Sequence, residues 1–268
     1  MKYCKENVRG FKDSVTELIP CLTLCAIAKG IVLALFTNTV VKAPSRKFWG
    51  WSAVLFVGAL VLEAFSIIYP KKSLLYSEVT HTMNGQIALT FDDGPSTEIT
   101  PRILDLLKKY NVTGTFFVLG HCARRHPELL RRIIAEGHTI GIHSDRHKAM
   151  LLPSAGVLSN RIEECRAAIR DAIGDNVPIS LFRPPYGYRN AITHSAAKRS
   201  GVKVVMWSVD SMDYMLRPAS YIANKVLRQV RPGDVILMHD AGRNIMSADA
   251  LELILQGMTR LGYTSAAM

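Results

Sequence analysis

Two short segments of the chain combine carboxylates and imidazoles at a spacing that suits a metal ion. Asp92 and Asp93 are adjacent and follow an apolar run that ends at Phe91. His143 and His147 lie four residues apart, a spacing at which two imidazoles can converge on one ion from a helical turn or a tight loop. Mixed carboxylate and imidazole ligation suits Zn²⁺, with Co²⁺, Ni²⁺ and Mn²⁺ as alternatives. The sequence therefore predicts one divalent metal ion near these side chains.

Each segment also has a simpler explanation. The Asp-Gly and Gly-Pro pairs at 93–95 are ordinary turn sequences, and two histidines at this spacing are often a surface coincidence. One metalloenzyme alternative fails directly, because Ser144 stands where the H-E-x-x-H motif of zinc proteases requires a glutamate. The metal interpretation therefore depends on other polar residues that reach the same place in the fold.

Three later segments also end an apolar run in polar side chains, at 183–187, 207–214 and 236–240. In the first, two prolines fix the backbone immediately before Tyr186, and such a segment can hold a backbone N–H in place. A single polar strand end that faces water would carry no information. Five of them in succession favour one shared site.

Short β-rich runs alternate with helical periods from about residue 73, which is typical of an α/β protein. The sequence predicts strands at 86–91, 114–119, 139–143, 181–183, 202–209 and 235–238. It predicts helices at 101–110, 127–136, 159–173, 190–200, 219–230 and 248–261. This pattern fits a parallel barrel smaller than the usual eightfold one, or a doubly wound sheet. Both architectures gather catalytic groups at the carboxyl ends of the strands.

The five polar segments resemble the motifs of the polysaccharide deacetylases of carbohydrate esterase family 4, also described as the chitooligosaccharide deacetylase-like domain. The resemblance covers roughly residues 84–262. The motifs occur in the family order, as TFDDGP at 90–95, HSDRH at 143–147, RPPYG at 183–187, DSMDY at 210–214 and LMHD at 237–240. The resemblance implies a distorted (β/α) barrel with fewer than eight complete units. It also implies metal-dependent removal of N- or O-acetyl groups from sugar polymers.

The resemblance further implies a role for each matching residue. Asp92 would be the general base, and Arg183 would orient it. The metal ion would be held by Asp93, His143 and His147.

The remaining implied roles concern the oxyanion and the leaving amine. The backbone N–H of Tyr186 would serve the oxyanion, and His239 would act as the general acid. Asp210 is expected to tune His239, because a neighbouring carboxylate favours the imidazolium form. The chain departs from the family pattern at Tyr214, where many members carry Trp, so the wall of the sugar groove stays unassigned.

The N-terminal part of the chain falls outside the resemblance and is strongly apolar. Two runs, at 18–36 and 49–69, are each interrupted by a single charged residue. Each is long enough to cross a bilayer, whose core of about 30 Å needs roughly 20 helical residues. We expect one or two transmembrane helices in an anchor at 1–72, followed by the catalytic domain at 73–268. A buried core helix is the alternative for either run, and a signal peptide for the first.

The positive-inside rule gives opposite orientations for one span and for two. If only 49–69 spans, most flanking Lys and Arg precede the span and place the catalytic domain outside the cytoplasmic membrane of a bacterium. If both runs span, the two flanks share a side and carry more Lys and Arg than the connecting loop, which favours a cytoplasmic domain. The polymeric envelope substrates implied by the resemblance favour the outside orientation.

Composition narrows the class of protein further. Of the 268 residues, 49% are hydrophobic and 21% charged, which excludes a disordered polymer, and 18 Gly with 12 Pro are too few for a collagen-like repeat. The net charge of +11 includes no basic block, so we expect anionic membrane or envelope polymers as partners and no nucleic acid. The five cysteines form no CxxC pair, which supports neither a disulfide framework nor a thiolate zinc site.

We therefore expect a metal-dependent enzyme that removes N-acetyl groups from an acetylhexosamine glycan of the cell envelope, either peptidoglycan or a chitin-like polymer. The alternative is a cytoplasm-facing deacylase, a deacetylase or deformylase, that acts on a lipid-linked sugar. A third possibility is a membrane-anchored glycan-binding protein without activity. That possibility conflicts with the presence of every implied ligand and of the base. The sequence predicts no oligomeric state.

Overall fold

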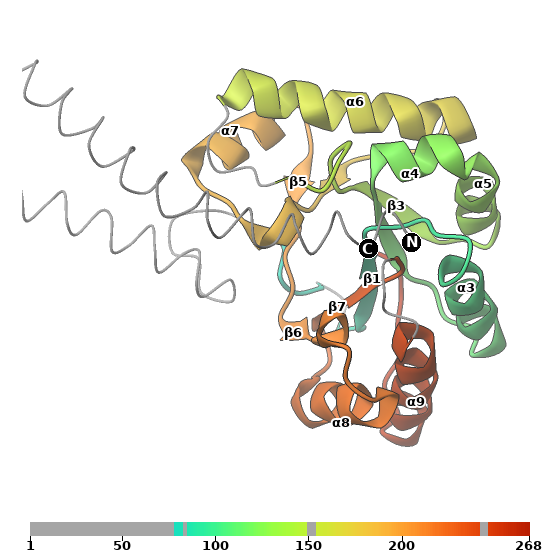
Figure 1. Ribbon diagram of the computed structural model, residues 1–268. Coiled ribbons are helices and arrows are strands. Elements are labelled where there is room, and N and C mark those ends of the chain that lie inside the picture. Colours follow the sequence, from blue (N-terminus) through green and yellow to red (C-terminus); the bar gives the residue numbers. More distant parts are fainter. Residues whose placement is uncertain (1–77, 83–84, 149–153, 242–245) are drawn as a thin grey trace, which may run out of the picture. The chain divides into compact units, whose positions relative to one another are not determined.

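The computed structural model describes residues 78–82, 85–148, 154–241 and 246–268 (Figure 1). The two apolar runs predicted to span a membrane, and the predicted domain boundary at residue 72, lie outside these residues. Of the helices that the structure describes, none has both the length and the apolar character needed to cross a bilayer.

A seven-stranded sheet forms the centre of the described part of the chain, in the order β5-β4-β3-β2-β1-β7-β6. Every pair of neighbouring strands is parallel, so the carboxyl ends of all the strands lie at the same end of the sheet. The predicted α/β class is confirmed. The strands are β1 (Ala88–Asp92), β2 (Thr115–Val118), β3 (Thr139–Ile142), β4 (Leu181–Phe182), β5 (Lys203–Val204), β6 (Val209–Asp210) and β7 (Val235–His239).

The single strand predicted at 202–209 is wrong, because this segment forms two short strands on opposite edges of the sheet. β5 pairs with β4, whereas β6 pairs with β7. Only residues 205–208 separate the two strands, and an extended chain advances at most about 3.6 Å per residue, so the two edges approach within roughly 20 Å. The sheet is therefore curled into a half-barrel (Figure 1), which agrees with the expected distorted barrel.

Helices cover the sheet in the order of the strands that they join. They are α3 (Thr100–Lys109), α4 (Gly120–Arg125), α5 (Pro127–Ala135), α6 (Ala155–Ile173), α7 (Ala191–Arg199), α8 (Ala219–Gln229) and α9 (Met246–Arg260). Neighbouring helices pack in the sequence α7-α6-α5-α3-α9-α8, and α4 packs against α6. This series of contacts forms an outer layer around the curled sheet (Figure 1).

Six of these helices were predicted, and local signals explain why. Pro101 is the second residue of α3 and Pro127 is the first residue of α5, and a helix tolerates proline in its first turn. α7 starts with a capping box between Asn190 and Thr193. α4 was missed because it has six residues, no side-chain cap and a glycine at its start.

Successive side chains of β1 point alternately to the apolar core and to the face that carries the candidate site. Leu89 and Phe91 belong to the buried apolar cluster, in which Phe91 stacks on Phe116 with ring centroids 4.9 Å apart. Successive side chains in a strand point to opposite faces, so Thr90 and Asp92 face the other side of the sheet. The same short strand therefore supports the core and presents a carboxylate at its end.

Candidate active site

The carboxyl ends of four strands bring most of the predicted site residues together. β1 ends at Asp92, which lies opposite His239 at the end of β7. His143 follows the last residue of β3, and Arg183 follows the last residue of β4. Strand-end placement, the basis of the sequence prediction, is correct for these residues.

Three of the predicted residues form a compact group that could hold a metal ion. One ligand atom from each of Asp93, His143 and His147 lies within 4.8 Å of the other two. Asp93 Oδ1 is 3.4 Å from Nε2 of His143 and 3.4 Å from Nε2 of His147. This oxygen is buried and has no hydrogen-bond partner among the described residues. Buried carboxylate oxygens rarely lack a partner, so this donor set fits a cation bound between the three side chains.

The surroundings of the two imidazoles suit a role as metal ligands. His143 Nδ1 lies 2.7 Å from the carbonyl oxygen of Arg183, which can only accept a hydrogen bond. Nδ1 therefore donates to this carbonyl, and Nε2 is the nitrogen that lies toward Asp93. Burial lowers the pKa of His147 to about 4, so this imidazole is neutral at neutral pH.

Asp92 is held beside this group by Arg183, as the family resemblance implies. Arg183 Nη1 donates to Asp92 Oδ1 at 2.7 Å, and the other carboxylate oxygen of Asp92 lies 3.9 Å from His143 Nε2. Both side chains are buried. A buried, charge-assisted hydrogen bond of this kind fixes the direction of the carboxylate.

The Arg183 guanidinium is held by contacts on several sides. The group donates to Thr90 Oγ1 at 2.8 Å and to the carbonyl oxygens of Val205 and Met206 at 3.2 and 3.1 Å. It also lies over the Phe117 ring, 4.2 Å from the centroid. The segment between β5 and β6 thus supplies acceptors to the residue that orients Asp92.

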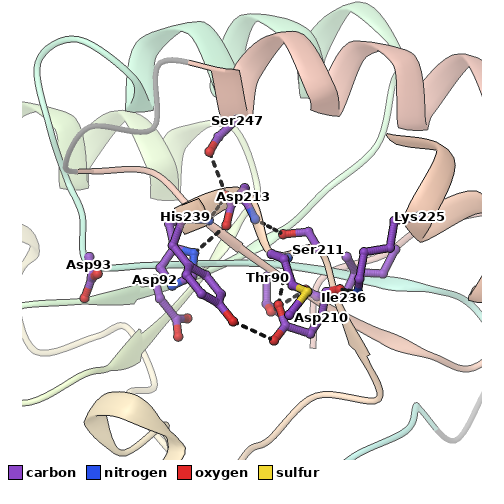
Figure 2. Close-up of polar contacts among 12 residues, drawn as sticks. Thr90, Asp92, Asp93, Asp210, Ser211, Asp213, Lys225, Ile236, His239 and Ser247 are labelled. Carbon is purple, nitrogen blue, oxygen red and sulfur yellow. Dashed lines mark hydrogen bonds and ion pairs between the residues drawn. The ribbon is translucent and has the colours of Figure 1, made fainter. Parts of the chain in front are cut away.

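The carboxylate that contacts His239 is Asp213. Asp213 Oδ1 lies 2.7 Å from His239 Nδ1, and Oδ2 accepts from the His239 backbone N–H at 2.8 Å and from Ser247 Oγ at 2.6 Å (Figure 2). Burial opposes the imidazolium form, but Asp213, with smaller contributions from Asp93 and Asp92, raises the pKa of His239 to about 10. His239 is therefore protonated at neutral pH.

The expected pairing of Asp210 with His239 is wrong. Asp210 accepts from the backbone N–H of Met212 at 2.8 Å and from Tyr214 OH at 3.3 Å (Figure 2). The Tyr214 ring in turn meets the His239 ring edge-on, with centroids 5.6 Å apart. Within the described part of the chain, Asp210 therefore reaches His239 only through Tyr214, because the chain makes a left-handed turn at Met212 and Asp213 then contacts the imidazole.

Tyr186 lies beside one of the candidate metal ligands. Its ring meets the His147 ring edge-on, with centroids 4.2 Å apart. It sits in a short 3₁₀ turn, Pro185–Gly187, with φ at 59°. A left-handed tyrosine between two prolines and a glycine is a rigid unit. The structure therefore places the Tyr186 side chain next to a candidate ligand, and the oxyanion role of its backbone N–H stays a prediction.

Asp240 was given no role by the sequence analysis, yet it anchors the loop after Asp93. Its Oδ2 accepts from Thr100 Oγ1 at 2.7 Å, and its carbonyl oxygen accepts from Ser96 Oγ at 2.7 Å. A Cβ atom on Gly94 would lie 2.0 Å from Oδ2. Burial raises the pKa of Asp240 to about 7. The only sequence signal for this contact is the glycine, which permits the close approach.

The fold and the site together define a parallel α/β protein. At the carboxyl ends of its strands lie a candidate metal centre, the Asp92 carboxylate held by Arg183, and the His239 imidazolium held by Asp213. A family model described as polysaccharide deacetylase matches residues 80–205. The chain is 36% identical over 180 residues to the peptidoglycan-N-acetylglucosamine deacetylase of Bacillus cereus, covering 66% of this chain and 83% of that protein. The chain belongs to the polysaccharide deacetylase family.

Two further matches extend this comparison. The peptidoglycan-N-acetylglucosamine deacetylase PgdA of Listeria monocytogenes is 39% identical over 180 residues. The match covers 67% of this chain but only 37% of that longer protein. The solved structure of the peptidoglycan deacetylase PdaC from Bacillus subtilis has a TM-score of 0.63 and 37% identity, covering 68% of this chain and 87% of that one.

Proposed function

We propose that this protein hydrolyses N-acetyl groups on an acetylhexosamine glycan of the cell envelope, releasing acetate and a free amine. One observation carries the proposal. A buried carboxylate oxygen of Asp93, without a hydrogen-bond partner among the described residues, faces two imidazole nitrogens at 3.4 Å, beside a second carboxylate fixed by a buried arginine. Asp93 and the two histidines can thus bind a cation, while the second carboxylate, Asp92, is available as a base.

The residues at this site fit a divalent metal ion. Asp93, His143 and His147 would hold it through one oxygen and two nitrogens, and this donor set suits Zn²⁺ while also accepting Co²⁺, Ni²⁺ or Mn²⁺. When bound, the ion supplies Lewis acidity to the acetamide carbonyl and to water.

Asp92 then acts as the general base. Arg183 holds one of its oxygens, and the other points toward the metal group, 3.9 Å from His143 Nε2. This carboxylate accepts a proton from the water that attacks the acetyl carbon. The Tyr186 backbone N–H, in its rigid turn, donates to the oxyanion that develops on the carbonyl oxygen.

His239 completes the reaction by donating a proton to the departing amine. The amine leaves as a neutral group only if it gains a proton as the C–N bond breaks. Asp213 holds Nδ1 of His239, which leaves Nε2 available for this transfer. The roles of base and acid are thus given to two different residues, Asp92 and His239, at the ends of neighbouring strands.

The relatives favour an envelope polymer as substrate over a lipid-linked sugar. The matched proteins of Bacillus cereus and Listeria monocytogenes are named as peptidoglycan-N-acetylglucosamine deacetylases. We therefore propose peptidoglycan or a chitin-like oligomer for this chain. We also propose that residues 1–72 anchor the enzyme in the membrane with the catalytic domain outside, on the hydropathy and charge pattern of the sequence alone.

Mass spectrometry of glycans incubated with the purified full chain tests this function. Peptidoglycan fragments and chitooligosaccharides should lose acetyl groups, and acetate should appear in equal amount. A chelator should abolish the reaction, and added Zn²⁺ should restore it. Intact substrates after incubation with zinc-loaded protein would refute the proposal, and turnover of a lipid-linked sugar alone would support the alternative substrate.

A further inference from the structure

Each of the two loops that carry the candidate metal ligands contains a left-handed residue other than glycine. These are Asp93, with φ at 76°, and Ser144, with φ at 80°. Such backbone is unfavourable for L-amino acids and persists only where surrounding contacts determine it. Something in the fold must therefore hold both loops, and the separation between them sets the distance from Asp93 to the two histidines.

One segment contacts both loops. Residues 119–124, called here the bridging segment, run from the end of β2 into α4, and β2 lies between β1 and β3 in the sheet. Toward the first loop, the Leu119 backbone N–H donates to the carbonyl oxygen of Gly94 at 3.0 Å, and Cys122 Sγ lies 3.7 Å from the carbonyl oxygen of Asp93. The bridging segment thus binds the backbone on both sides of the Asp93–Gly94 bond.

The same segment forms more bonds with the second loop, residues 143–147, which is called here the histidine loop. The backbone N–H of Gly120 donates to the carbonyl oxygen of Ser144 at 3.1 Å. The carbonyl oxygen of Asp145 accepts from the backbone N–H of His121 at 3.1 Å and from its Nδ1 at 2.9 Å. Arg124 forms an ion pair with the Asp145 side chain. The carbonyl groups of both left-handed residues therefore contact this one segment.

The contact between the bridging segment and the histidine loop leaves no free space. A Cβ atom on Gly120 would lie 2.6 Å from Asp145 Oδ1, 3.3 Å from Asp145 Cα and 3.1 Å from Cys165 Cα. Two of these atoms are backbone and cannot rotate away. The bridging segment and the loop are thus packed backbone to backbone, so a shift of one must move the other.

We propose that the bridging segment sets the spacing of the metal ligands, with His121 and Arg124 as positioning residues. The inference rests on the proposed function, because it requires Asp93, His143 and His147 to bind a metal ion. His121 and Arg124 act through Asp145, which lies midway between the two histidines in sequence. Loss of either contact loosens the backbone around Asp145. It therefore weakens metal binding while the protein stays folded.

Zinc affinity of the purified full chain tests this proposal, with Zn²⁺ titrated into metal-free protein against a chromophoric competitor. His121→Leu and Arg124→Met should each raise the Kd for Zn²⁺ about 10- to 100-fold, the effect of removing groups that orient metal ligands. His121→Asn should recover most of the affinity, because its amide can still donate to the Asp145 carbonyl. Arg125→Ala, at an exposed position of the same helix, should bind Zn²⁺ like the wild type.

The outcomes separate this inference from the proposed function. Wild-type Kd in both His121→Leu and Arg124→Met, with circular dichroism showing folded protein, would overturn the positioning role and leave the function intact. A wild-type chain that binds no Zn²⁺ would overturn both. Gly120→Ala provides a further measurement. Its Cβ would displace the turn directly, and if it folds it should show a larger loss of affinity than either side-chain variant.

Discussion

Asp92 and Asp93 leave the end of β1 in different directions because the backbone turns left-handed at Asp93. Asp92 continues the strand and meets Arg183, whereas Asp93 meets His143 and His147. Two adjacent carboxylates in a common environment would repel each other, and one would tend to take up a proton. The two carboxylates therefore have separate partners, Arg183 for the base and the two histidines for the metal ligand.

Replacement of Asp92 by asparagine should separate these two tasks. Asp92→Asn keeps the size of the side chain and a hydrogen-bonding oxygen, but it cannot accept the proton. We expect about one equivalent of zinc per chain to be retained, and kcat to fall by about 10²-fold or more, the usual scale for a removed acid or base. Elemental analysis and steady-state kinetics measure the two effects. Activity near that of the wild type would contradict the base role.

The pairing of His239 with Asp213 predicts a pH dependence. Asp213 raises the pKa of His239, so the acid stays protonated, and the enzyme active, up to a pH above the ordinary range of histidine. Asp213→Asn removes the carboxylate charge and lowers this pKa, so the basic limb of the pH–kcat profile should move to lower pH by about 1–3 units.

Asp210→Asn is the matched control for this measurement. Asp210 contacts Tyr214 and the Met212 backbone and makes no direct bond to His239 among the described residues. Its replacement should leave the basic limb nearly in place. A limb that moves in Asp210→Asn and stays fixed in Asp213→Asn would reverse the assignment. The sequence could not choose between these carboxylates, because three residues of separation do not reveal the left-handed turn at Met212.

At the scale of elements, hydrophobic periodicity identified the strands whose ends carry the site. It could do so because β1 and β2 are buried throughout and β7 is buried up to His239, where its apolar run stops. It failed for residues 202–209, because one apolar run serves two strands on opposite edges of the sheet. Pairing partners far apart in sequence decide that division, and no local pattern records them.

A single glycine in β3 links strand packing to the site. A Cβ on Gly141 would lie 2.6 Å from Cδ1 and Cε1 of the Phe117 ring, and the Arg183 guanidinium lies over that ring at 4.2 Å. Gly141→Ala should lower the free energy of unfolding by about 1–3 kcal/mol, as overpacked cores do. It should also lower kcat, because a displaced ring disturbs the arginine that orients Asp92. Urea denaturation and kinetics test both effects.

Gly156→Ala provides a control, because here the added methyl group should not lower the stability of the protein. Gly156 lies in the first turn of α6, where a Cβ would find only Ser154 Oγ, at 3.9 Å. Alanine is preferred to glycine in helices by up to about 1 kcal/mol, so this variant should be as stable as the wild type or slightly more stable, with unchanged kcat. Equal stability losses in the two variants would show that the effect at Gly141 does not arise from the Phe117 contact.

At the scale of the whole molecule, the site forms only when distant parts of the chain meet. β7, near the C-terminal end, lies directly beside β1, and Thr90 Oγ1 donates to the carbonyl oxygen of Ile236 at 2.6 Å. Asp92 and His239 are therefore neighbours in space although the strands between them in sequence form most of the sheet. Composition excluded a disordered polymer, but the closing contact of β1 with β7 depends on this topology.

The orientation of the chain in the membrane is the last prediction, and it follows from charge. Eight Lys and Arg precede the apolar run at 49–69, whereas Lys71 and Lys72 follow it directly, so a single span places the catalytic domain outside the cytoplasm. Protease added to intact spheroplasts should then digest the domain while a cytoplasmic marker protein stays whole. If 18–36 also spans, the domain lies inside and survives until the membrane is broken. That result would contradict the proposed orientation and direct the search for a substrate to lipid-linked sugars, because an envelope polymer would be out of reach.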